Sequence, residues 1–127
     1  MISSSYSAAN NRPIGFLDSG IGGLPYLARA RELLPEERFV YYADHKHFPY
    51  GERAVEEVQE IVHRAVTDLV AEEQPKLVCV ACNTASVVSL AALRSAFHIP
   101  FVGVVPAIKP AGMLSGAGRI GVLATSR

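Results

Sequence analysis

A cysteine stands where an apolar, strand-like segment of this chain gives way directly to a helix-like segment. Cys82 ends the run KLVCVAC (76–82), and Asn83 and Thr84, which follow it, favour the first positions of a helix. The positive end of a helix dipole stabilises a thiolate at such a position, and the thiolate is the reactive form of cysteine. The pattern predicts that Cys82 is a reactive thiol, and the alternative is a small buried hydrophobic side chain.

An acidic residue followed by a glycine-rich turn is a second candidate for chemistry. Asp18 and Ser19 lie between the strand-like IGFLD (14–18) and the helix-like LPYLARARELL (24–34). The turn leaves backbone N–H groups free at a helix start, which suits a small anion such as a carboxylate. A dinucleotide is disfavoured, because Pro25 replaces the third glycine of the dinucleotide fingerprint and Asp18 would repel phosphate. A tight turn explains the glycines equally well, but it does not explain an unpaired carboxylate at a strand end.

Short apolar runs alternate with longer amphipathic segments along the chain. The predicted strands are 14–18, 39–44, 76–82, 101–105 and 119–125, and the predicted helices are 24–34, 52–73 and 84–97. Alternating strands and helices, with strands that are apolar almost throughout, predict an α/β fold. The expected architecture is a flavodoxin-like doubly wound parallel sheet with helices on both faces.

The carboxyl ends of the predicted strands carry polar residues suited to binding. Ligands of doubly wound sheets bind at that edge, so Asp18, Cys82 and the loop HKHFPYG (45–51) are expected to meet there. Asp44, at the end of the second strand, either shapes this site or caps a turn, and both interpretations stay open. Thr125, at the end of the fifth predicted strand, is a further candidate.

Composition and charge restrict the class of protein. The 127 residues suffice for one domain, and twelve basic and twelve acidic side chains cancel. The chain has no basic stripe, which argues against a nucleic-acid partner, and its longest apolar runs are too short to cross a membrane. Residues 1–12 are polar and lack the apolar core of a signal peptide, so we expect them to form a flexible tail. The α/β domain is expected over 13–127. We expect a cytoplasmic protein.

The two cysteines form a C-x-x-C pattern that invites a redox or zinc interpretation. In a strand, Cys79 and Cys82 point to opposite faces and lie ~10 Å apart, whereas a disulfide needs α-carbons closer than ~7 Å. The chain has no second C-x-x-C or histidine pair to complete a zinc site. We therefore expect neither a disulfide nor a metal.

Four blocks of the sequence, taken in order, resemble one enzyme family. IGFLDSGIGG, YYAD with FPYG, ACNTAS and IPFVGVVPAIKPA are similar to the N-terminal half of glutamate racemases, from about Pro13 to the end of the chain. The resemblance implies one half of a pseudo-symmetric two-domain enzyme that interconverts L- and D-glutamate without a cofactor and supplies D-glutamate for peptidoglycan. In this family two cysteines flank the substrate α-carbon; one removes the α-proton and the other returns a proton to the opposite face.

The resemblance also assigns roles to individual residues. Cys82 matches the thiol that removes the α-proton, and Asp18 matches the carboxylate that helps to manage the proton of that thiol. The positions that match substrate-binding residues are Ser19, Tyr50, Gly51, Asn83 and Thr84. Glutamate is the implied substrate, and the full-length form is expected to be a homodimer.

The chain departs from the family in one respect. The second cysteine of the family lies in a Cys-Thr-His motif of a C-terminal half, and this chain ends at Arg127 without that motif. We expect a partial chain that does not racemise glutamate by itself. Two alternatives stay open: a related racemase of aspartate or another small carboxylate, and a non-catalytic flavodoxin-like binding domain.

Overall fold

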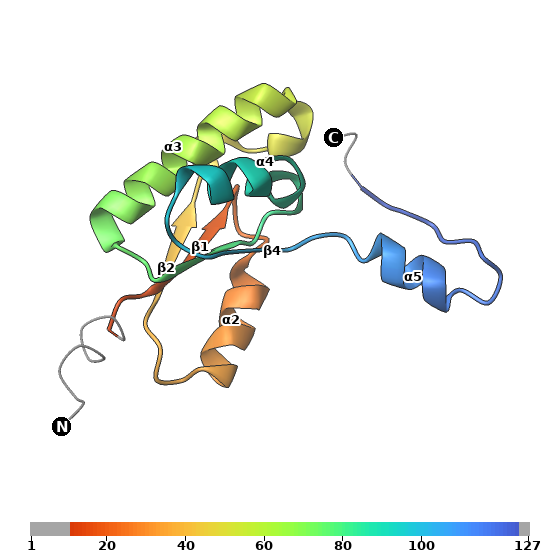
Figure 1. Cartoon of the computed structure of the whole chain (residues 1–127), viewed down its shortest axis with the longest axis horizontal. Helices are drawn as coiled ribbons and strands as arrows, with labels where there is room; N and C mark the ends of the chain where they lie inside the picture. The colour runs from red at the N-terminus through yellow and green to blue at the C-terminus, as the bar shows by residue number, and fades with distance from the viewer. Residues whose placement is uncertain (1–10, 125–127) are drawn as a thin grey trace.

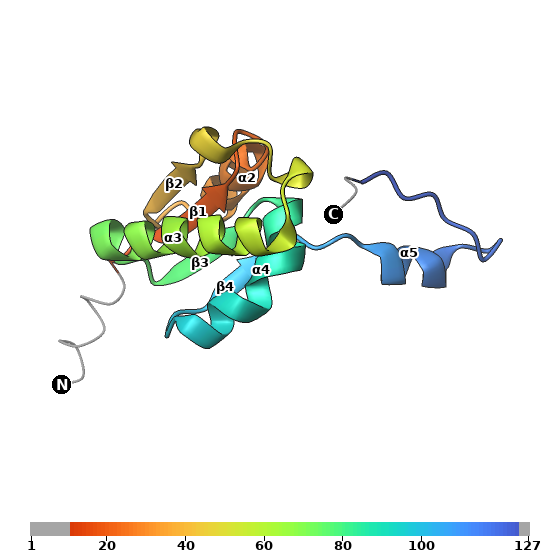
Figure 2. The same cartoon turned by 90° about the horizontal axis from the view of Figure 1, so that it is seen from above.

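Four parallel strands form the centre of the molecule. The computed structural model describes residues 11–124, and its strands are β1 (Ile14–Asp18), β2 (Phe39–Ala43), β3 (Leu77–Val80) and β4 (Phe101–Gly103). Their order in the sheet is β2-β1-β3-β4 (Figure 2). Because β1 and β3 are the inner strands, the residues that follow them lie side by side at the carboxyl edge. The predicted α/β doubly wound fold is confirmed.

Helices cover both faces of this sheet. Helices α3 (Val55–Glu73) and α4 (Asn83–Ala96) pack on one face, and α2 (Leu24–Leu33) lies on the other (Figures 1 and 2). The larger core cluster lies on the α3 and α4 side and includes Leu17, Val62 and Val80. A smaller cluster on the α2 side contains Ile14 and Phe16. The alternation along β1 thus supplies both cores.

The longest helix, α3, follows from its apolar spacing. Val58, Val62, Ala65 and Leu69 recur every three or four residues and are all buried against the sheet and α4. Its start differs from the predicted residue 52, because 50–52 form a separate 3-10 turn. Gln74 ends the helix in the left-handed conformation with φ of 49°.

The fifth predicted strand is wrong within the described residues. Residues 119–124 form no strand, and β4 covers only three of the five residues predicted for it. After β4 the chain runs away from the sheet through the short helix α5 (Ile108–Leu114) (Figures 1 and 2). A strand requires a neighbour to satisfy its backbone groups, and this segment has none: Leu123 is fully exposed. Thr125 lies outside the described residues.

Arg12, the last residue of the predicted polar tail, is hydrogen-bonded to the domain. Arg12 donates hydrogen bonds from Nε to the Gln74 carbonyl at 2.6 Å and from Nη2 to the Pro75 carbonyl at 3.0 Å. This residue at the border of the predicted tail therefore contacts the end of α3.

Over residues 11–124, every helix is too short or too polar to span a membrane.

Candidate active site

A cleft opens at the carboxyl edge of the two inner strands. It has a volume of about 320 Å³ and combines polar groups from the ends of β1 and β3 with an apolar rim. Its lining residues are Asp18, Ser19, Gly20, Ile21, Gly22, Tyr26, Phe48, Ala81, Cys82 and Asn83. The structure thus brings together four of the seven residues that the sequence proposed for the site.

Cys82 lies at the boundary between β3 and α4, as its sequence position predicts. It is the N-cap residue of α4, and its carbonyl accepts the Ser86 N–H at 2.9 Å, which closes the first helical turn. The thiol is largely buried but lines the cleft, and its sulfur lies 3.6 Å from the hydroxyl oxygen of Ser19. The sulfur therefore lies beside a polar group at the end of β1, and the first N–H groups of α4 begin immediately after Cys82.

Asp18 has partners that the sequence did not reveal. Its Oδ2 accepts the Gly23 N–H at 3.0 Å and the Tyr41 hydroxyl at 3.1 Å, so the carboxylate is not unpaired. The Tyr41 hydroxyl also lies 3.2 Å from the Gly20 carbonyl oxygen. Burial, followed by the nearby Asp18 charge, raises the pKa of Tyr41 to about 12, so its hydroxyl remains a donor at neutral pH.

Tyr41 is a site residue that the sequence analysis missed. It lies inside a predicted strand, where its type is ordinary, and no local pattern distinguishes it. The parallel register pairs Phe16 with Tyr41, two residues before the end of β1. Only this cross-strand register brings its hydroxyl to Asp18, so a prediction of the order and register of β1 and β2 would have found it.

The glycine-rich turn has a steric explanation at Gly23. A Cβ atom there would lie 2.7 Å from Cβ of Ala81 and 2.9 Å from the Tyr41 hydroxyl. The close approach of the turn to β3 and Tyr41 therefore requires glycine, and it places the Gly23 N–H on Asp18. At Gly22 the nearest atom would be 3.7 Å away, so that position has room for a side chain.

Three predicted substrate-binding residues lie outside the lining of this cleft. Tyr50 is 1% exposed, and its hydroxyl donates to Oδ2 of Asp44 at 2.7 Å. Gly51 follows in the same 3-10 turn. Thr84 and Asn83 line an adjacent hollow of about 370 Å³ together with residues of the segment after β4. Asn83 is therefore shared between the two hollows.

Cys79 lies on the opposite side of the sheet. It packs with Ile14 and Phe16 in the smaller core cluster, whereas Cys82 belongs to the larger one, which confirms that the two side chains face apart. Both cysteines are free, and burial raises the pKa of the Cys79 thiol. Within residues 11–124 no group of three or more histidine, cysteine and acidic side chains is placed to hold a metal ion.

Volume alone does not identify the site. A larger hollow of about 550 Å³ lies between α3 and α4 and is lined by none of the predicted site residues. One of its lining residues, His63, is exposed and packs against Phe97 with tilted rings whose centroids are 5.1 Å apart. The smaller cleft is the better candidate because a thiol, a carboxylate and a helix start converge there.

The chain belongs to the Asp/Glu/Hydantoin racemase family, whose model matches residues 26–127. Within that family, the chain is 47% identical over 116 residues to the glutamate racemase of Clostridium botulinum (strain Langeland / NCTC 10281 / Type F). This match covers 91% of this chain and 45% of the relative. It is 50% identical over 113 residues to the glutamate racemase of Deinococcus radiodurans, with 89% of this chain and 39% of the relative covered.

Solved structures agree with these relatives. The fold matches Escherichia coli glutamate racemase in complex with L-glutamate and the activator UDP-MurNAc-ala, with a TM-score of 0.76 and 47% identity. That match covers 84% of this chain and 40% of the other. The resemblance to glutamate racemases inferred from sequence is confirmed, and the chain spans less than half the length of these relatives.

Proposed function

We propose that this chain forms one wall of the active site of a glutamate racemase, with Cys82 as an acid-base group. The observation that carries the proposal is the position of the Cys82 sulfur, 3.6 Å from the Ser19 hydroxyl in a cleft shared with Asp18. The similarity to the Escherichia coli enzyme, which was solved with L-glutamate, supports glutamate as the substrate.

The chemistry requires one proton to leave the α-carbon and another to arrive on the opposite face. The Cys82 thiolate takes the α-proton and becomes a thiol, while the electron pair of the broken C–H bond stays on the substrate. A thiol on the other face then donates its proton to the α-carbon and becomes a thiolate. Hydrogen-bond donors at the start of α4 and on Asn83 stabilise the negative charge that develops, which replaces an electron-withdrawing cofactor.

Asp18 and Ser19 support the thiol from the neighbouring strand. Ser19 is the hydrogen-bond neighbour of the sulfur, and the Asp18 carboxylate shares the cleft with it. We assign Asp18 to managing the proton of Cys82 between turnovers, and Ser19, Tyr50, Gly51, Asn83 and Thr84 to holding the substrate, either directly or through the loop that they belong to.

The half of the active site that this chain forms is insufficient for inversion of configuration. The only other cysteine of the chain, Cys79, packs on the far side of the sheet. We therefore propose that the 127 residues alone do not racemise glutamate and that a second domain supplies the opposite thiol. The whole enzyme would act in the cytoplasm as a dimer and supply D-glutamate for peptidoglycan.

A fusion protein tests the proposal directly. This chain is joined to the part of the Clostridium botulinum glutamate racemase that it does not match, and the formation of D-glutamate from L-glutamate is measured. We expect the fusion to be active, the unfused chain to be inactive, and Cys82→Ser to lower the rate by more than about a hundredfold. Cys79→Ser is the matched control and should retain activity.

Other outcomes would contradict parts of the proposal. Undiminished activity of the Cys82→Ser fusion would remove Cys82 from the mechanism. Faster racemisation of aspartate than of glutamate would favour the related racemase. A folded but inactive fusion would favour a non-catalytic binding domain.

A further inference from the structure

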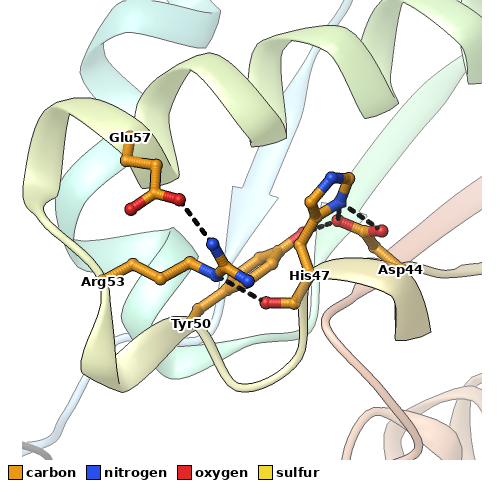
Figure 3. A network of polar contacts seen from close by, with 5 residues as sticks. All are labelled: Asp44, His47, Tyr50, Arg53 and Glu57. Carbon is orange, nitrogen blue, oxygen red and sulfur yellow. Dashed lines mark hydrogen bonds and ion pairs between the residues drawn. The ribbon is translucent and has the colours of Figure 1, made fainter.

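A buried carboxylate organises the loop that forms one side of the cleft. Asp44 is 7% exposed, and its Oδ2 accepts the Tyr50 hydroxyl at 2.7 Å. Nδ1 of His47 lies 2.8 Å from each carboxylate oxygen (Figure 3). One side chain at the end of β2 thus holds two residues of the following loop.

The same loop is held at its far end by α3. Arg53 donates from Nε to the His47 carbonyl at 2.8 Å, and its Nη1 forms an ion pair with Glu57 (Figure 3). Glu57 lies in the first turn of α3. His47 is therefore fixed twice, by its ring to Asp44 and by its carbonyl to Arg53.

Asp44 also links the loop to the other half of the cleft. Its backbone N–H donates to the Asp18 carbonyl at 2.9 Å, which continues the register of β1 and β2 by one bond. The backbone of Asp44 is thus tied to the end of β1, while its side chain is tied to the following loop. A displacement of the loop relative to Asp18 requires breaking contacts at Asp44.

The loop needs such contacts because regular structure does not hold it. Residues 45–52 form two short 3-10 turns rather than a strand or a long helix. Phe48, between these turns, lines the cleft, and its ring would lie 3.4 Å from a Cβ atom placed on Gly20. The position of the cleft wall over Gly20 therefore depends on side-chain anchors on either side of Phe48.

We infer that Asp44 and Tyr50 are positioning residues, which set the wall of the cleft at Phe48 through the buried Tyr50–Asp44–His47 contacts rather than by touching substrate. This inference rests on the proposed function and gives Tyr50 a different role from direct contact through its side chain. The ring of Tyr50 is buried in the larger core and its hydroxyl is occupied by Asp44, so neither is offered to the cleft.

Removal of one hydroxyl tests the inference on the chain as it exists. Tyr50→Phe keeps the buried ring and removes only the hydrogen bond to Asp44. The matched control is Tyr42→Phe, on β2, because the Tyr42 hydroxyl makes no hydrogen bond to any described residue. Amide hydrogen exchange of 45–53 and the rate of Cys82 alkylation by iodoacetamide are measured in both variants.

We expect Tyr50→Phe to speed amide exchange in 45–53 by about tenfold, because a buried hydrogen bond to a carboxylate is lost. Exchange in β1 and α3 should stay the same. Alkylation of Cys82 should accelerate severalfold, since the Phe48 wall beside it loosens, whereas alkylation of Cys79 should not change. Tyr42→Phe should leave all of these rates unaltered.

Two results would overturn the inference. The first is loop exchange in Tyr50→Phe equal to that in Tyr42→Phe. The second is a parallel rise at Cys82 and Cys79, which indicates general destabilisation instead of a moved wall. Neither readout involves glutamate. If the loop loosens in Tyr50→Phe but the fusion protein is inactive, the positioning role of Asp44 and Tyr50 stands, and only the proposed function is refuted.

Discussion

The hydroxyl of Tyr41 lies 3.1 Å from Oδ2 of Asp18, across the pair of strands β1 and β2. The Gly23 N–H reaches the same oxygen from the turn after β1. Two donors on one oxygen fix the orientation of the carboxylate. No described residue donates a hydrogen bond to Oδ1 of Asp18, and Asp18 lines the cleft.

Replacing Tyr41 should make the alkaline stability of the protein less dependent on pH. The folded pKa of Tyr41, about 12, exceeds its usual value of 10.0. The folded state therefore holds the phenolic proton more tightly, and the stabilisation is fully present below pH 10 and is lost as the pH rises toward 12. In urea unfolding, Tyr41→Phe should cost about 1 to 2 kcal/mol at pH 8, and this deficit should shrink as the pH rises through that interval. A constant deficit over this range would contradict the bond to Asp18.

Gly23 should tolerate no side chain, whereas Gly22 should. A Cβ atom at Gly23 would lie 2.7 Å from Cβ of Ala81, which cannot rotate away, so Gly23→Ala should destabilise the protein by about 1 to 3 kcal/mol. Gly22→Ala places its Cβ no closer than 3.7 Å to Asp18 Oδ2 and should change the free energy of unfolding by less than about 1 kcal/mol. Thermal unfolding of the two variants measures the difference, and equal losses would refute the steric explanation.

Features of this chain that depend on neighbouring residues in the sequence could be predicted from it. Periodicity alone located α3, and the position of Cys82 before Asn83 predicted its place at a helix start. Contacts that depend on the pairing of strands could not be predicted from the sequence. The clearest case is Tyr41, the partner of Asp18 on β2. The segment 119–124 has a strand-like composition, but composition cannot supply the neighbouring strand that such a segment requires.

The side chain of Tyr50 shows another limit of motif reading. The resemblance placed Tyr50 among the substrate-binding residues, and the structure directs its hydroxyl to Asp44. A motif identifies which residues a site depends on without distinguishing side-chain contact from support of the backbone. Burial makes that distinction, because a side chain that is 1% exposed cannot present its ring to a ligand.

The two cysteines should differ in their reaction with iodoacetamide. Burial raises the pKa of Cys79 above its usual 9.0, so this residue remains a thiol at pH 8 and should react slowly. Cys82 is itself largely buried, but it lines the cleft at the start of α4 and should react at least about tenfold faster. Peptide mapping by mass spectrometry after timed quenching distinguishes them. Equal, slow labelling of both residues would support the alternative of an inert domain.

The segment after β4 should make the isolated chain self-associate. Its apolar side chains contact little of the sheet: Met113 is 78% exposed and Leu114 is 86% exposed. Apolar groups exposed together associate to leave water, so sedimentation velocity should show species larger than a monomer as concentration rises. The double substitution Met113→Glu and Leu114→Glu should restore the monomer, and Ser95→Glu, which adds a charge on the exposed side of α4, is the control. A wild-type chain that remains monomeric at every concentration, or equal association of the double variant and the control, would show that this segment does not drive association.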